Sequence, residues 1–356
     1  MPVMMLALNG ATVAVLYFGG GMVMGGTFEL GDLQAFINYI VQILMSVMMV
    51  AMSLLQLSRA QACAHRIKEV LETEPSVENK PEGEICRAAL PGEAADGTDH
   101  VLPAPRGEVE FRDVSFKYVA SGSGDDVLSH ISFHVRPGQF VAIVGGTGTG
   151  KSTLVNLIPR FYDVTGGQVL LDGVDVRNYP LEELRGRIGM VLQTNILFSG
   201  TIRENLSMGD RGAGEAQLCA ALETAQAADF VAEAGGLDAV LVQGGVNLSG
   251  GQRQRLSLAR ALVRGGAVLV LDDCTSALDP ATERRVLDGL ERRPGQAVLH
   301  ITQKVRAART ADRILVLEEG RQVGLGTHRS LLDTCPTYRE IWASQAPEEE
   351  GEDGTR

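Results

Sequence analysis

Two short stretches of the sequence combine residue types that can hold phosphate and a metal ion. Residues 140–158 read "FVAIVGGTGTGKSTLVNLI", an apolar strand, a glycine-rich loop and a helix, and they fit the pattern G-x-x-x-x-G-K-[ST]. Glycines let the backbone wrap a phosphate, and the N-terminus of the helix adds its dipole. This pattern predicts a nucleotide-binding loop made of Gly145, Gly146, Thr147, Gly148, Thr149, Gly150, Lys151, Ser152 and Thr153.

Four side chains in these stretches have distinct expected tasks. Lys151 would reach the outer phosphates, and the Ser152 hydroxyl would ligate Mg²⁺. The second stretch, "VLVLDDCTSALD" at residues 268–279, ends an apolar run with Asp272 and Asp273. Such a pair usually gives one carboxylate to a metal and the other to a water. We expect Asp272 to hold Mg²⁺, directly or through water.

A third stretch predicts a second anion-binding helix start. Residues 247–262 read "NLSGGQRQRLSLARAL", with Ser249, Gly250, Gly251 and Gln252 where the helix begins. The arginines that follow would by themselves be typical of a solvated helix face. Two phosphate-binding segments in one chain favour a sandwich, in which each of two chains covers the nucleotide of the other.

The 356-residue chain has two unlike parts, and the residues named above all lie in the second part. From about residue 106 onward, short apolar runs alternate with glycine turns, as in a soluble α/β domain. Residues 3–24 and 33–57 are instead long apolar stretches, each able to cross a bilayer. A signal peptide is the alternative for the first stretch, but it lacks a positive start and a second span follows it.

The charges flanking these spans predict their orientation. The connection "GGTFELGD" has no Lys or Arg, whereas "SRAQACAHRIKE" has three, so everything after residue 58 is expected to face the cytoplasm. Gln34, Asn38 and Gln42 recur every four residues and form one polar stripe. This stripe either lines a substrate cavity or makes hydrogen bonds between helices.

The remaining composition sets limits on function. The net charge of −12 and the lack of a basic stripe argue against nucleic-acid binding. The five cysteines show no paired spacing, which favours reduced thiols over disulfides or a metal site. We expect a partial membrane domain at 1–74, a linker at 75–106, a nucleotide-binding domain at 107–344 and an acidic disordered tail at 345–356.

The motifs together resemble the ATP-binding cassette of ABC transporters of the exporter type, over essentially the whole chain. The resemblance implies an α/β P-loop ATPase with a mixed sheet and a helical subdomain, preceded by two transmembrane helices, with ATP and Mg²⁺ as ligands. It implies that Tyr118 stacks on adenine, although a core aromatic at a strand end is the alternative. It also implies that Gln193 touches Mg²⁺, and that Ser276 to Asp279 cross a dimer interface.

The same resemblance implies a multi-pass protein of the cell membrane that exports a small molecule or a lipid. An exporter half has six spanning helices, and this sequence matches the last two. We therefore expect a partial protein, such as a fragment or a misplaced start, rather than a natural two-helix subunit.

Two departures from the family pattern concern hydrolysis. Most members have glutamate where this chain has Asp273, whose shorter side chain falls about an ångström short of the attacking water. The family's switch histidine lies eight residues before the Ala-Asp of the next strand, and here that position is Gln303. Glutamine can hydrogen-bond a phosphate but carries no charge. His300 is out of register and is expected to be a packing residue inside the strand.

These departures resemble the degenerate subunit of a heterodimeric exporter. We expect its own site to bind ATP and turn it over slowly, while Ser249 to Gln252 complete the competent site of a partner half. A homodimeric exporter with slow turnover is the second hypothesis. A non-transporting nucleotide switch that controls dimerisation is the third, and the membrane spans count against it.

Overall fold

The computed structural model describes residues 2–81, 86, 102–118, 126–291 and 295–345. Most of the expected linker and residues 346–356 of the expected acidic tail lie outside these ranges, whereas the first residue of that tail, Gln345, is the last residue of a helix, Pro336–Gln345. The chain divides into two compact units, Met1–Pro75 and Ser76–Arg356. Each unit is described by itself.

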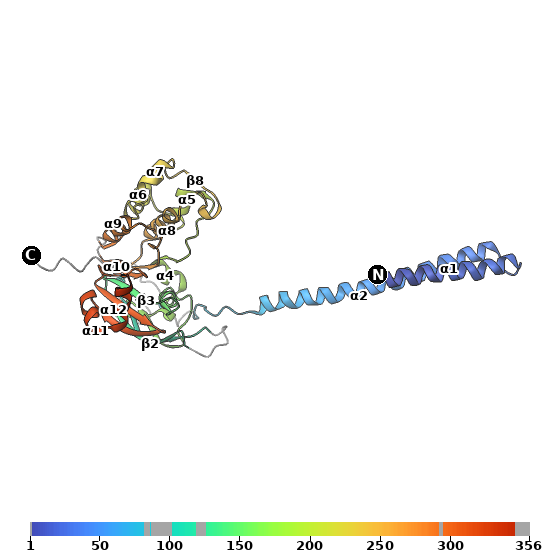
Figure 1. Cartoon of the computed structure of the whole chain (residues 1–356), viewed down its shortest axis with the longest axis horizontal. Coiled ribbons are helices and arrows are strands. Elements are labelled where there is room, and N and C mark those ends of the chain that lie inside the picture. Colours follow the sequence, from blue (N-terminus) through green and yellow to red (C-terminus); the bar gives the residue numbers. More distant parts are fainter. Residues whose placement is uncertain (1, 82–85, 87–101, 119–125, 292–294, 346–356) are drawn as a thin grey trace, which may run out of the picture. The chain divides into compact units, whose positions relative to one another are not determined.

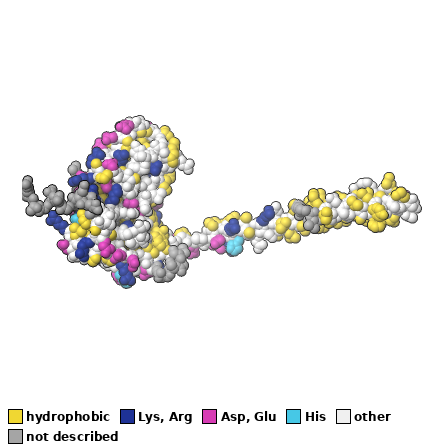
Figure 2. Space-filling view, viewed as in Figure 1, with side chains coloured by type: hydrophobic (Ala, Val, Ile, Leu, Met, Phe, Trp, Pro, Cys, Tyr) yellow, Lys and Arg dark blue, Asp and Glu magenta, His cyan; other side chains and the backbone are white. Residues whose placement is uncertain are grey.

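The first unit is a pair of long helices, α1 (Pro2–Met24) and α2 (Leu30–Glu72), which lie side by side (Figure 1). They approach closely at Gly19, where an added Cβ would lie 2.3 Å from the Cδ1 atom of Leu33. Leu33 is buried in this contact. By length and composition both helices are able to cross a membrane, and hydrophobic side chains cover much of their surface (Figure 2). The expectation of two long apolar helices is confirmed.

The second unit is built on a ten-stranded mixed sheet with the order β5-β4-β1-β2-β12-β11-β3-β10-β9-β6. Its strands are β1 (Val109–Phe116), β2 (Leu128–Val135), β3 (Phe140–Gly145), β4 (Gly166–Leu171), β5 (Val174–Asp175), β6 (Ile188–Val191), β9 (Val268–Asp272), β10 (Ala297–Ile301), β11 (Arg313–Glu318) and β12 (Arg321–Gly326). The strands β7 (Gly200–Thr201) and β8 (Val240–Leu241) form a separate pair.

Helices cover this sheet and build a separate helical region. They are α3 (Lys151–Asn156), α4 (Leu181–Gly186), α5 (Ile202–Ser207), α6 (Glu215–Thr224), α7 (Ala228–Glu233), α8 (Gly250–Arg264), α9 (Pro280–Glu291), α10 (Val305–Ala308), α11 (His328–Thr334) and α12 (Pro336–Gln345), with short 3-10 turns η2 (Val176–Asn178) and η3 (Gln243–Gly245). In Figure 1, α5 to α8 gather at one end of this unit. The mixed sheet with P-loop and helical region confirms the predicted fold class.

The functional edge of the sheet belongs to its parallel half. Strands β11, β3, β10, β9 and β6 run parallel to one another, so their carboxyl ends share one edge. Strands β3, β9 and β10 are almost entirely buried apolar runs, as expected for parallel strands covered on both faces.

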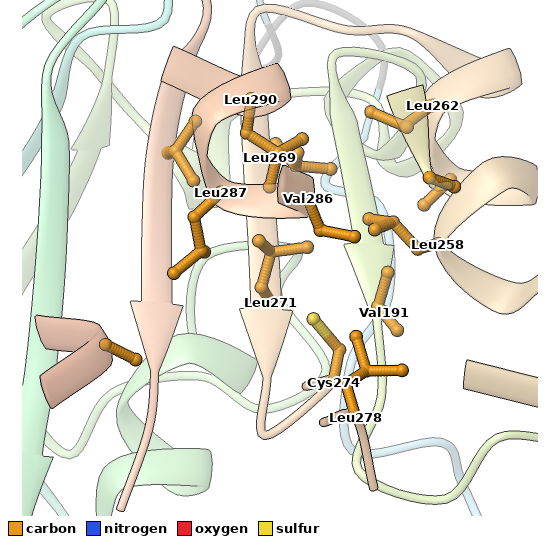
Figure 3. Packing of buried hydrophobic residues seen from close by; sticks show 14 of the residues in the cluster. Val191, Leu258, Leu262, Leu269, Leu271, Cys274, Leu278, Val286, Leu287 and Leu290 are labelled. Carbon is orange, nitrogen blue, oxygen red and sulfur yellow. The ribbon is translucent and has the colours of Figure 1, made fainter. Parts of the chain in front are cut away.

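Apolar packing ties the helical region to this half of the sheet. Leu269 and Leu271 of β9 lie in one buried cluster with Leu258 of α8 and Val286 of α9 (Figure 3). Leu278, from the loop after β9, packs into the same cluster. This packing holds the end of β9 and the loop that follows it, where the candidate chemistry lies.

Part of the expected linker is held on the second unit. The Nζ of Lys80 donates to the Oδ1 of Asn178 at 2.7 Å, and the backbone N–H of Leu181 donates to the Oδ1 of Asn79 at 2.9 Å. The amide of Cys86 donates to the carbonyl of Asn178 at 2.8 Å. These residues attach to the corner formed by η2 and α4.

Candidate nucleotide-binding site

The glycine-rich loop connects β3 to α3, as the motif predicts. Gly148 and Gly150 have φ of 80° and 89°, in the left-handed region that favours glycine. A Cβ on Gly150 would also lie 2.8 Å from the Cδ2 atom of Leu128 and 3.0 Å from the carbonyl of Val127. Conformation and close packing therefore both require glycine at residue 150.

Lys151 begins α3 and is folded back over the loop. Its Nζ donates to the carbonyl of Gly145 at 3.0 Å, to the carbonyl of Gly146, and to the Oγ1 of Thr149 at 3.4 Å. The side chain is buried, and this burial lowers the pKa of Lys151, while the carboxylates of Asp272 and Asp273 raise it. A cation held by loop oxygens and poorly hydrated is well suited to exchange these partners for phosphate oxygens.

The carboxylate of Asp272 lies at the buried end of β9 beside the loop. Burial raises the pKa of Asp272, whereas a hydrogen bond with Ser152 and the charge of Lys151 lower it. Mg²⁺ prefers oxygen ligands and is commonly bound by one or two protein oxygens plus phosphates and water. The hydroxyl of Ser152 and the carboxylate of Asp272 therefore fit a Mg²⁺ ion that accompanies a nucleotide.

Gln193 and Gln303 reach the same edge from the flanking strands. Gln193 follows β6, whose Val191 pairs with Leu271, and Gln303 follows β10, whose Ile301 pairs with Asp272. Both glutamine side chains are exposed. The carboxyl ends of β3, β10, β9 and β6 thus bring the loop, Gln303, the two aspartates and Gln193 together.

Asp273 directly follows β9 and has a strained backbone. Its φ is +50°, which is uncommon for a residue other than glycine, and its amide donates to the carbonyl of Ile301 at 3.1 Å. Burial raises the pKa of the Asp273 carboxyl first and the charge of Asp272 second, and Lys304 and Lys151 oppose the rise. The backbone hydrogen bond ties the orientation of Asp273 to the end of β10.

The backbone around Gln303 is held from two directions. The amide of Thr302 donates to the carbonyl of Ile143 at 3.2 Å, and the Nε2 of Gln345 in α12 donates to the carbonyl of Gln303 at 2.7 Å. His300 lies inside β10 and is fully buried, as its register predicts. Neither of its ring nitrogens has a hydrogen-bond partner among the described residues, and burial lowers the pKa of His300 to about 4.

Tyr118 contacts the phosphate loop's helix. Its hydroxyl hydrogen-bonds the Oγ1 of Thr153 at 3.1 Å, and its ring packs edge-on against Phe116 and Tyr162, with centroids 4.8 and 5.1 Å apart. The ring is half-buried. Both sequence interpretations of Tyr118, adenine stacking and a core aromatic at a strand end, remain open on this geometry.

The segment Ser249–Gln252 forms the start of α8. The Oγ of Ser249 accepts from the amide of Gln252 at 3.2 Å, and the Oε1 of Gln252 accepts from the amide of Ser249 at 2.9 Å. This reciprocal cap fixes the first turn. An added Cβ on Gly251 would lie 3.1 Å from the carbonyl of Ala277, so glycine lets the helix start pack against the loop after β9.

The polar stripe of the first unit lies on one face of α2, as its spacing predicts. The Nε2 of Gln34 donates to the Oδ1 of Asn38 at 3.4 Å, and the carbonyl of Gln42 accepts from the hydroxyl of Ser46 at 2.8 Å. A role for Gln34, Asn38 and Gln42 in a substrate cavity stays a prediction.

Sequence reasoning missed two residues that hold the loop Ser276–Asp279. These are Gln254 of α8 and Lys304, which follows Gln303. The sequence offered one signal for each residue. Gln254 lies two residues after the segment Ser249–Gln252, and Lys304 directly follows Gln303. Their contacts are between residues more than 20 positions apart, so spacing alone could not show them.

Known proteins resemble this chain in sequence. Residues 128–276 match the ABC transporter family. An uncharacterized ABC transporter ATP-binding protein of Mycobacterium bovis is 44% identical over 97% of this chain and 57% of its own length. An ATP-dependent lipid A-core flippase of Syntrophus aciditrophicus is 36% identical over 94% of this chain and 53% of its own length. The chain spans a little over half the length of these curated relatives.

A solved structure extends the likeness to three dimensions. The structure of a bacterial Atm1-family ABC exporter with ATP bound has a TM-score of 0.72 and 30% identity, over 97% of this chain and 58% of that one. The fold is that of a P-loop ATPase of the ABC type, preceded by two long apolar helices. The chain is similar to ABC transporter ATP-binding proteins and to an ABC exporter over a little more than half of their length.

Proposed function

We propose that this chain is the ATP-binding half of a heterodimeric ABC exporter whose own site holds ATP and Mg²⁺ more than it cleaves ATP. The observation that carries this proposal is the composition of the shared strand edge. The phosphate loop, Ser152 and Asp272 have the residues that binding needs, whereas Asp273 and Gln303 occupy the positions of the expected base and switch histidine.

The binding half of the proposal rests on oxygen and nitrogen groups that converge at the loop. Lys151 would bind the outer phosphates, while Ser152, Gln193 and Asp272 would hold Mg²⁺. The metal ion would neutralise phosphate charge during transfer. Tyr118 would stack on adenine, since its ring is half-buried and fixed at the helix that carries the loop.

The slow-turnover half rests on reach and charge. The backbone of Asp273 is held by the carbonyl of Ile301, so its short side chain gains no reach from movement of the strand end. General-base catalysis contributes about 10²- to 10⁴-fold and requires hydrogen-bond contact with the water. Gln303 adds no charge that would stabilise the transferring phosphate.

The role of the partner half follows from the exposed start of α8. Ser249 to Gln252 would cover the nucleotide bound by a second exporter half, which would supply the missing glutamate and histidine. α1 and α2 would be part of a multi-pass domain in the cell membrane, with the ATPase unit in the cytoplasm. The exported substrate would be a small molecule or a lipid, in line with the flippase among the relatives.

A homodimeric exporter with slow turnover is the second candidate, and one observation favours it. Burial raises the pKa of Asp273, which makes this carboxylate a stronger base than an exposed aspartate. In that case two equivalent sites would each hydrolyse ATP without a partner subunit.

ATP turnover by the chain alone and together with an exporter half that carries glutamate and histidine at the two positions tests the proposal. We expect tight binding of MgATP by the chain alone, and at least tenfold faster hydrolysis by the pair. Lys151→Met in this chain serves as the control that removes nucleotide from its own site. Equal turnover by the chain alone and by the pair would overturn the heterodimer proposal in favour of the homodimer.

A further inference from the structure

The loop Ser276–Asp279 is held by α8, the helix that begins in the segment Ser249–Gln252. The Nε2 of Gln254 donates to the Oγ of Ser276 at 3.0 Å, and its Oε1 accepts from the amide of Ala277 at 3.0 Å. Gln254 is buried, and both the donor and the acceptor of its side-chain amide are satisfied by this loop. These bonds connect the loop to α8.

Lys304 is the second residue that holds this loop. Its Nζ donates to the carbonyl of Thr275 at 3.2 Å, directly before the loop, and to that of Leu278 at 3.4 Å, near the end of the loop. The same nitrogen lies 3.3 Å from both carboxylate oxygens of Glu283 in α9. One ammonium group therefore connects the two ends of the loop to the helix that follows it.

This arrangement differs from an ordinary surface ion pair. The side chain of Glu283 is only 10% exposed, whereas the exposed pair Lys68 and Glu72 on α2 has both side chains at least 66% exposed. Exposed pairs contribute little to stability. Removing the Lys304 ammonium would leave the Glu283 carboxylate and the carbonyls of Thr275 and Leu278 without their charged hydrogen-bond donor.

Lys304 also lies next to the switch position in the chain. Its backbone follows Gln303, and its amide donates to the Oγ1 of Thr302 at 3.1 Å, so the side chain connects the end of β10 to the loop after β9. The first residue of the loop is tied to the end of β9, because the Oγ of Ser276 donates to the carbonyl of Asp273 at 3.0 Å. One residue therefore connects the position next to Gln303 with the loop.

We propose that Lys304 is a positioning residue that fixes the loop Ser276–Asp279 against the switch position, and that this fixation sets the rate of ATP turnover at the site the loop faces in the dimer. The effect on the loop is independent of the proposed function. The effect on turnover rests on the proposed dimer. Among the described residues, the side chain of Lys304 makes no hydrogen bond to the phosphate loop or to α3, so we expect its removal to change turnover more than nucleotide affinity.

Hydrogen exchange of the full chain tests the effect on the loop. In Lys304→Met we expect the amides of residues 276–278 to exchange about tenfold faster, because the loop loses a charged anchor at both ends. Lys304→Arg should restore slow exchange. Lys68→Met, which removes a lysine from the exposed pair, should leave this exchange unchanged.

A global loss of stability is distinguished by internal amides. The amides of residues 141–144 in β3 should keep their wild-type exchange in Lys304→Met. Glu283→Gln offers a milder second variant, since it keeps Lys304 and the packing of α9 but removes the charge partner. Unchanged loop exchange in both variants would overturn the proposal.

Steady-state ATPase measurements on the dimer test the effect on turnover. We expect Lys304→Met to lower kcat about tenfold while the KM for ATP changes less than twofold, with recovery in Lys304→Arg. Faster loop exchange with an unchanged kcat would overturn the link to turnover. If the chain alone hydrolyses ATP as fast as the pair, the proposed heterodimer fails, and the same kcat comparison on the homodimer still tests Lys304.

Discussion

The phosphate loop follows β3, and the segment with Gln303, called the switch loop below, follows the neighbouring strand β10. The side chains of the two loops are held in different ways. In the phosphate loop, the buried Nζ of Lys151 has three loop acceptors, and glycine conformation fixes the backbone. At the switch loop, the backbone of Gln303 is anchored by Gln345 while its side chain is exposed. We therefore expect phosphate binding to depend on the loop backbone together with Lys151, whereas a switch role at Gln303 would depend on one exposed side chain that substitution can remove without disturbing the fold.

The largest expected effect concerns the phosphate loop. Lys151→Met should weaken ATP binding by about 100-fold or more, because it removes a desolvated cation from the outer phosphates. Titration calorimetry of the full chain with MgATP measures this change, and Lys68→Met is the matched control. A loss of less than threefold would contradict the assignment of Lys151 to phosphate binding.

The next effect concerns the switch side of the edge. Asp273→Glu combined with Gln303→His should raise ATP turnover by the chain alone about 10- to 100-fold, since it restores reach and a titratable donor. The affinity for ATP should stay within about threefold of wild type. Asp273→Glu combined with Gln303→Asn keeps an uncharged amide and should gain less. If the glutamate–histidine variant gains no activity, another feature limits this site.

A third prediction concerns the strand that carries the switch loop. Burial holds the pKa of His300 at about 4, below its ordinary value of 6.5, so the unfolded chain binds the proton more readily than the folded one. The contribution of neutral His300 to the free energy of unfolding should be complete above pH 6.5 and should fall as the pH drops from 6.5 towards 4. The free energy of unfolding should be lower by about 2 kcal/mol at pH 5.

His300→Leu removes this titration and both unpartnered ring nitrogens. Urea unfolding of the variant should show a smaller decline in the free energy of unfolding between pH 7.5 and pH 5 than the wild type shows. Identical pH dependence of the two proteins would mean that other groups account for acid sensitivity.

The smallest effect separates the two interpretations of Tyr118. If its ring stacks on adenine, Tyr118→Ala should weaken ATP binding about tenfold, since stacking of a base on an aromatic ring contributes about 1–3 kcal/mol. Tyr118→Phe should change the affinity less than threefold, because it keeps the ring and loses only the hydrogen bond to Thr153. Equal affinities of the alanine variant and the wild type would favour the role of a core aromatic.

The sequence predicts the phosphate loop well because its motif is local and its geometry follows from glycine spacing and a strand–helix transition. The convergence of Gln193, Asp272 and Gln303 is also predictable, since each follows a buried apolar strand and parallel strands share their carboxyl edge. Contacts between side chains distant in sequence were not predictable. The hold of Lys304 on the loop after β9 depends on how α9 and the switch loop pack, which no single-segment pattern encodes.

The hold of Asn79 and Lys80 on the corner of η2 and α4 has a mechanical consequence for the ATPase unit. Only residues 73–78 separate the end of α2 at Glu72 from the attachment at Asn79, so the chain between these two residues extends at most about 25 Å. A force pulling on α2 would act first on the attachment at η2 and α4, and only through it on the sheet. Inserting a few flexible residues into 73–78 would lengthen this short connection and reduce the force that it transmits, without altering the site.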